Sequence, residues 1–186
     1  FLQALHSYLE KGISFKDLDF IYGSVTSNEN GNNLFIPLDG QQRLTSLTIF
    51  LIYLNNLQKD LPKRINLDAL IYSETYGEKS FNLDVPERKN CLDALYLTGE
   101  YNVKDSDDET VKNIAERYDD IQELFPDELK GAALPFFIDW LIQNVVLVVI
   151  TAYSDDNAYT IFETMNDRGL NLTPSEMLKG YLLSKV

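Results

Sequence analysis

The 186-residue sequence predicts an α+β fold, in which a small sheet is surrounded by many helices. Two short apolar runs, 34–38 and 145–153, have the length of strands, and the second consists largely of β-branched residues. Several longer segments repeat apolar residues at helical spacing, most clearly over 41–58. The hydrophobic content of 45% is enough for a packed core, and the length favours a single domain, 1–186.

In the first third of the chain we expect a helix, a hairpin and a long helix. Apolar residues recur at helical spacing over 1–11, and Gly12 ends that helix. Strands are predicted at 17–25 and 34–38, joined by a turn rich in Asn and Gly at 27–33. Pro37 lacks an N–H and therefore belongs at an edge or at a strand end. The helix over 41–58 is apolar on nearly every side, which places it in the core.

The middle of the chain, 60–144, is expected to be a mostly helical insertion or subdomain. A loop leads to a strand near 70–75, which pairs with 79–85, and helices follow at 86–96, 110–125 and 134–143. The acidic stretch 103–109 either binds a cation or is a solvated loop that caps the next helix, and the helix dipole favours the cap. Cys91 is expected as a small core residue and Trp140 as a packing anchor.

The last part of the chain begins with the run 145–153, which predicts a strand buried on both faces. A helix is predicted over 158–167, with Gly169 after it. Another helix opens at Thr173, where Glu176 completes a capping box and Pro174 takes the first helical position. Because helical pattern is already present at Phe1 and continues to the last residue, we expect a piece of a longer protein.

Composition excludes several classes of function. The formal net charge of −13 argues against nucleic-acid binding by this chain alone, because such binding needs a basic surface. A single cysteine cannot form an internal disulfide, which fits a reducing cytoplasm. His6 and Cys91 alone make neither a zinc site nor a histidine-metal nuclease site, and they give no support to nucleophilic catalysis. No apolar run is long enough to span a membrane, so a cytoplasmic location without a membrane partner is expected.

The stretch with the clearest chemistry is the turn Asp39-Gly40-Gln41-Gln42-Arg43 between a predicted strand and a predicted helix. The first N–H groups of a helix lack partners within it, and the helix dipole makes this end partly positive, so the turn suits an anion. Gly40 permits close approach of the backbone, Arg43 can give two parallel hydrogen bonds to a phosphate, and Asp39 can bind a metal ion or orient water. The structural alternative is that Asp39 caps the helix and Arg43 is simply exposed.

Two blocks of the sequence resemble a known family. The first, 39–47, resembles the DGQQR motif of the S-subunit-like domain of GmrSD-type restriction systems, in the ParB/sulfiredoxin-like superfamily. The second, 161–172, is similar to the family's FE-x-x-N-x-R-G-x-x-L block, and a helix carrying Lys179 follows it. The resemblance runs from about Leu5 to Val186, is weak in the middle, and lacks the family's upstream IP-x-x-QR block. It implies a small mixed sheet of the ParB/sulfiredoxin-like type.

The resemblance also implies binding and hydrolysis of a nucleoside triphosphate with Mg²⁺, in a bacterial anti-phage, modification-dependent restriction system. The phosphates are then assigned to Arg43 and to the N–H groups from Gly40 to Gln42. Asp39 ligates Mg²⁺ or positions the attacking water, and Gln41 and Gln42 orient that water or bind phosphate oxygens. An HNH-type nuclease domain is expected elsewhere in the full-length protein or in a partner, so that this chain meets DNA only indirectly.

For the second block, Asn166 and Arg168 are expected in the same cleft as the turn, with Lys179 as a further candidate. Alternatively, Asn166 and Gly169 shape a helix C-terminus while Arg168 is exposed to solvent. Glu163 is a separate candidate, as a salt-bridge partner of Arg43. Two other functions remain open from the sequence. The pocket either binds a nucleotide or another anion without turnover, as a regulatory scaffold, or belongs to a ParB-like nucleic-acid-binding module, which the charge disfavours.

Overall fold

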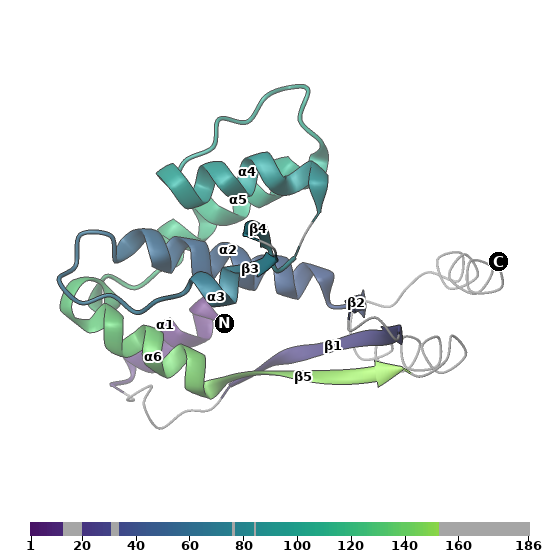
Figure 1. Ribbon diagram of the computed structural model, residues 1–186. Helices are drawn as coiled ribbons and strands as arrows, with labels where there is room; N and C mark the ends of the chain where they lie inside the picture. The colour runs from purple at the N-terminus through teal and green to yellow at the C-terminus, as the bar shows by residue number, and fades with distance from the viewer. Residues whose placement is uncertain (13–19, 31–33, 76, 84, 153–186) are drawn as a thin grey trace. The chain divides into compact units, whose positions relative to one another are not determined.

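The computed structural model describes residues 1–12, 20–30, 34–75, 77–83 and 85–152 (Figure 1). It combines helices and strands, so the predicted α+β class is confirmed. The chain forms two compact units: unit 1 is Phe1–Phe20 with Gln42–Val145, and unit 2 is Ile21–Gln41 with Val146–Val186. The ParB/sulfiredoxin-like type of the sheet, and a single domain with an insertion at 60–144, stay predictions.

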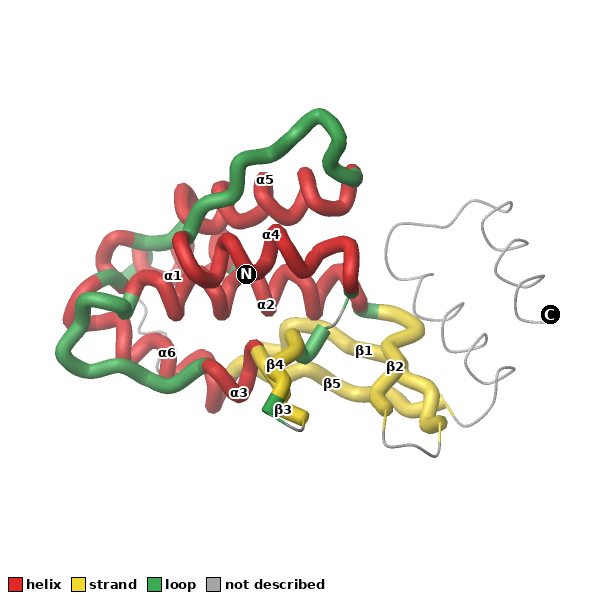
Figure 2. The backbone as a smooth tube through the Cα atoms, turned by 45° about the horizontal axis from the view of Figure 1, so that its top comes forward, coloured by secondary structure: helices red, strands yellow, loops and turns green. Residues whose placement is uncertain are grey.

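Unit 1 is built mainly from helices, and Figure 2 shows them in red with the strands in yellow. Two short 3₁₀ turns, η2 (Asp127–Leu129) and η3 (Gly131–Ala133), lie between the last two helices, and a small two-stranded hairpin directly follows the shortest helix. The helices and the hairpin strands are α1 (Leu2–Glu10), α2 (Gln41–Leu57), α3 (Asp68–Ile71), α4 (Pro86–Thr98), α5 (Glu109–Leu124), α6 (Leu134–Asn144), β3 (Tyr72–Thr75) and β4 (Glu78–Phe81).

Helix α2 is the centre of the core of unit 1. Its seven consecutive residues from Thr48 to Leu54 are all buried, and because seven residues make about two turns, every side of the helix is covered. Phe50 contacts α6 through Phe137, whose ring centroid lies 6.4 Å away, and Tyr53 contacts α5 through Tyr118 at 5.8 Å. The prediction of a central, buried helix is therefore confirmed.

Aromatic packing joins the first and last helices of unit 1 to this core. Trp140 on α6 is 6% exposed, stacks on Phe1 with 6.5 Å between ring centroids, and lies 5.7 Å from Phe137. On α1, His6 Nε2 lies 2.8 Å from the carbonyl oxygen of Leu124 at the end of α5. Trp140 is the packing anchor that the sequence predicted, and His6 has a structural contact.

The middle of the chain follows its predicted order, with one correction. The strand expected near 70–75 begins only at Tyr72, because Asp68–Ile71 forms the short helix α3. Tyr72 pairs with Phe81 across the hairpin, and their rings stack with 4.4 Å between the centroids. The buried Ile71 anchors this turn of helix, so tertiary packing overrides the extended pattern.

Unit 2 contains a three-stranded sheet in the order β2-β1-β5 among the described strands, formed by β1 (Phe20–Asn30), β2 (Leu34–Asp39) and β5 (Val145–Ala152). The hairpin of β1 and β2 is antiparallel, as predicted, but β1 continues through the expected turn as far as Asn30, which pairs with Leu34. Backbone pairing with β2 outweighs the turn preference of the Asn-rich sequence. Among the described strands, β2 lies at one edge of the sheet, which is one of the two positions expected for Pro37.

The prediction that the run 145–153 is buried on both faces is wrong for its described part. Strand β5 is the other edge of the described sheet, and Val146, Val148 and Val149 are 49%, 43% and 56% exposed. Branching at Cβ favours the extended backbone in either setting, so the apolar run predicts the strand but not its burial. Among the described helices, none is long and apolar enough to cross a membrane.

Candidate functional site

The turn from Asp39 to Arg43 has the local geometry that the sequence predicted. Asp39 is the last residue of β2, and α2 begins at Gln41. Gly40 joins them with φ = 86°, a left-handed conformation that a side chain at this position would strain. Gly40, not Asp39, immediately precedes the helix, which weakens the alternative in which Asp39 is the helix cap.

The polar residues that open α2 lie on the surface, at the positive end of a long helix. Gln41, Gln42 and Arg43 are exposed, and Gly40 is buried. The backbone N–H groups of the first turn of α2 have no acceptors within the helix, and the aligned peptide dipoles add partial positive charge there.

A further arginine, which sequence reasoning missed, lies beside the first turns of α2. Arg88 on α4 donates from Nη1 to Thr45 Oγ1 at 3.2 Å. Thr45 is four residues after Gln41 and therefore on the same side of the helix, whereas Arg43 is on the other side. Hydrogen bonds from Thr110 are the main cause that lowers the pKa of Asp108, and the charge of the half-buried Arg88 adds to this shift. No motif signals this residue, because 43 positions separate it from Thr45.

The second block of predicted site residues lies outside the described part of the chain. Asn166, Arg168 and Lys179, together with Glu163, fall within 153–186. Their convergence on the turn at Asp39 therefore stays a prediction.

Other kinds of chemistry find no support in the described residues. They contain no group of three or more His, Cys, Asp or Glu side chains placed to hold a metal ion. Cys91 is 1% exposed, and burial raises the pKa of its thiol to about 11, so the nucleophilic thiolate is scarce at neutral pH.

In the acidic stretch, Asp108 accepts a hydrogen bond from the backbone N–H of Thr110 at 2.7 Å and caps α5, which confirms the capping role.

Comparison with known protein families identifies the chain. The model of the GmrSD restriction endonuclease N-terminal domain matches residues 2–183, which is nearly the whole sequence. The chain belongs to this family. The GmrSD-type family that the sequence resemblance implied is thereby confirmed. No match was found among curated proteins.

Membership of the GmrSD N-terminal family assigns the chain to a restriction system. Domains of this family are typically joined to a C-terminal nuclease domain, which agrees with the expectation that the cutting chemistry is supplied from outside this chain. The family match covers the turn at Asp39–Arg43 without assigning roles to its residues.

Proposed function

We propose that this GmrSD N-terminal domain binds a nucleoside triphosphate at the Asp39–Arg43 turn and hydrolyses it to control the nuclease of its restriction system. The observation that carries the proposal is the turn itself, in which a strand end, a left-handed glycine and the exposed start of α2 follow one another. Phosphate groups bind well in this arrangement, because N–H groups and the helix dipole point at them.

Each residue of the turn has a task in the proposed reaction. Arg43 binds the phosphates through its planar fork of donors and neutralises charge that develops during transfer. Asp39 positions the attacking water, and the amides of Gln41 and Gln42 orient that water or hold phosphate oxygens. Phosphoryl transfer depends mainly on positioning and charge neutralisation, so these groups suffice in kind.

The donor set fits Mg²⁺ that arrives with the nucleotide, rather than a metal centre formed by the protein alone. Protein sites for Mg²⁺ in nucleotide enzymes use one or two carboxylates, and substrate phosphates and water fill the other positions. Asp39 is the carboxylate that the turn offers, and the described residues hold no larger ligand cluster. When bound, the ion neutralises phosphate charge.

The test is calorimetric titration of the chain with each nucleoside triphosphate and Mg²⁺, followed by assays of phosphate release. We expect Arg43→Ala to weaken binding by about tenfold or more, because a charged hydrogen-bond pair is lost. Lys63→Ala, an exposed cation on the loop after α2, is the matched control and should bind like the wild type. If Arg43→Ala and the wild type bind the nucleotide with equal affinity, Arg43 does not bind the phosphates.

The same titration also tests whether Arg88 contributes to nucleotide binding. Its guanidinium approaches α2 from the side of Thr45, so we expect Arg88→Ala to reduce nucleotide affinity and Arg88→Lys to restore part of it. Lys89→Ala, the exposed neighbour on α4, is the control. If Arg88→Ala lowers only the melting temperature, Arg88 merely ties α4 to α2.

A further inference from the structure

A second candidate binding site lies at the opposite end of α2, wholly within unit 1. A pocket of about 450 Å³ opens there between the end of α2, the loop that follows, the start of α3 and the last turn of α4. This volume falls in the range of small-molecule sites. Asn55 in the pocket wall lies 14 positions after Gln41 along the helix, about 20 Å at 1.5 Å per residue, so the pocket is distinct from the turn.

The wall of this pocket is held in place by hydrogen bonds. Gln58 is 1% exposed and clamps the loop, because its Nε2 donates to the carbonyl of Ile65 at 2.7 Å and its Oε1 accepts from the N–H of Ile65 at 2.8 Å. Lys59 Nζ donates to the carbonyls of Tyr96 and Leu97 at the end of α4. The loop is thus fixed at both of its ends before any ligand arrives, which lowers the entropic cost of binding.

The charge in the pocket favours an anion. Lys59 and Arg64 both line it, and the Lys59 ammonium has a third N–H beyond the two that the carbonyls accept. Arg64 is exposed and has no hydrogen-bond or ion-pair partner among the described residues. Two cations at one pocket stand out in a chain whose net charge is −13.

The one carboxylate in the pocket wall is already compensated. Asp68 Oδ1 accepts from the Tyr96 hydroxyl at 2.7 Å, and Asp68 Oδ2 lies 3.9 Å from Lys79 Nζ. Burial and this hydrogen bond raise the pKa of Tyr96 to about 12, so its phenol stays neutral and remains the donor. Asn55 and Asn66 add amide groups that can hydrogen-bond the uncharged part of a ligand.

We propose that this pocket binds a small organic anion, whose phosphate or carboxylate group meets Arg64 and Lys59 while its hydroxyl or amide groups meet the polar wall. Arg64 is the principal recognition residue, because its planar fork of donors matches either anion. The site is independent of the nucleotide site proposed above, since no residue belongs to both.

The test is titration of the whole chain at millimolar probe concentrations, followed by backbone amide NMR. The probes are inorganic phosphate, acetate, ribose 5-phosphate and uncharged ribose. We expect the charged probes, and not ribose, to shift the amides of the loop at 59–68, with phosphate and acetate showing which anion is preferred. Ribose 5-phosphate should bind more tightly than inorganic phosphate, since its hydroxyl groups reach the polar wall.

Arg64→Gln should lower the affinity for ribose 5-phosphate by about tenfold, because a charged hydrogen-bond pair is lost. Lys63→Gln removes the same charge from the neighbouring exposed residue, which does not line the pocket, and should change the affinity by less than about twofold. Arg43→Ala should leave these shifts unchanged. The proposal is overturned if no charged probe shifts the loop, or if Arg64→Gln and Lys63→Gln weaken binding equally.

Discussion

Single side chains hold the connections of unit 1 in place. The Gln58 amide satisfies both backbone groups of Ile65 and thereby closes the loop after α2. The Asn56 amide donates both to the carbonyl of Leu95 and to the Tyr118 hydroxyl, which links α2 to α4 and α5. The partners of Asn56 lie 39 and 62 positions away in the sequence, so its role is visible only in the folded chain.

The cap of α5 predicts a pH-dependent stability. The backbone hydrogen bond from Thr110 lowers the pKa of the Asp108 carboxyl from its ordinary value of 3.8. A carboxyl whose pKa is lower in the folded state stabilises the fold above its unfolded pKa, and this contribution disappears as the pH falls through the folded value. Asp108→Ala should therefore lower the melting temperature at neutral pH, and the deficit relative to wild type should shrink in acid.

Asp108→Asn is the matched control for this cap. It keeps a side-chain oxygen for the N–H of Thr110 but cannot titrate, so it should retain most of the stability at neutral pH. Thermal unfolding followed by circular dichroism over the acid range measures all three proteins. A deficit of Asp108→Ala that does not change with pH would contradict the role assigned to the charge.

At the scale of elements, the central helix decides how unit 1 is assembled. Helix α2 is surrounded, so each neighbouring helix can present one apolar stripe to it and leave its other side to solvent. On α6, this division separates adjacent residues: Phe137 is fully buried among Phe50, Phe125 and Trp140, whereas Phe136 is 69% exposed.

This pair of phenylalanines gives a direct test of the core. Phe137→Ala should destabilise the fold by about 3–5 kcal/mol, because the lost contacts leave a cavity. Phe136→Ala makes the same chemical change on the exposed side of α6 and should cost less than about 0.5 kcal/mol. Urea denaturation of the two variants measures both values, and similar losses would show that the assigned helix face is wrong.

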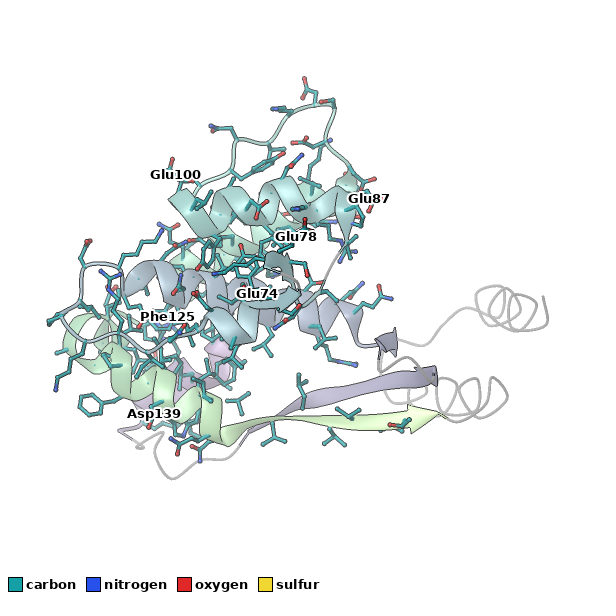
Figure 3. The ribbon with its side chains drawn as sticks, in the orientation of Figure 1. Glu74, Glu78, Glu87, Glu100, Phe125 and Asp139 are labelled. Carbon is teal, nitrogen blue, oxygen red and sulfur yellow. The ribbon has the colours of Figure 1, made fainter. Side chains whose placement is uncertain are left out.

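At the scale of the molecule, exposed acidic side chains come from several elements of unit 1. Figure 3 shows Glu74, Glu78, Glu87, Glu100 and Asp139 coming from several elements, and all five are exposed, while Phe125 is only 3% exposed. Such a surface repels a phosphate backbone, in keeping with the net charge of −13. In a restriction endonuclease, DNA contact is then expected from outside this chain.

This distribution of charge predicts that the isolated chain does not bind duplex DNA. Fluorescence anisotropy with a labelled duplex should show no saturable binding at low salt, where electrostatic attraction is least screened. A protein with a strong basic patch serves as the positive control. Binding that weakens steeply as salt rises would contradict the prediction and favour a nucleic-acid-binding role instead.

The sequence by itself determined the α+β class, the order of the elements and the geometry of the turn at Asp39–Arg43. Helical spacing, strand-like runs and the Asp-Gly turn are properties of short segments, and the backbone preferences of those segments are visible in the sequence alone. The DGQQR block also pointed to the family that the comparison confirmed. The second block, at Asn166 and Arg168, stays a prediction because it lies outside the described residues.

Only the tertiary structure decided which elements are neighbours. It placed the apolar strand β5 at an edge of the described part of the sheet, turned Leu70 and Ile71 into helix, and brought Arg88 to Thr45. It also assembled the pocket around Arg64 from segments up to 42 positions apart in the chain, since Asn55 and Leu97 both line it. These outcomes depend on packing between distant segments, and no local preference in the sequence encodes that packing.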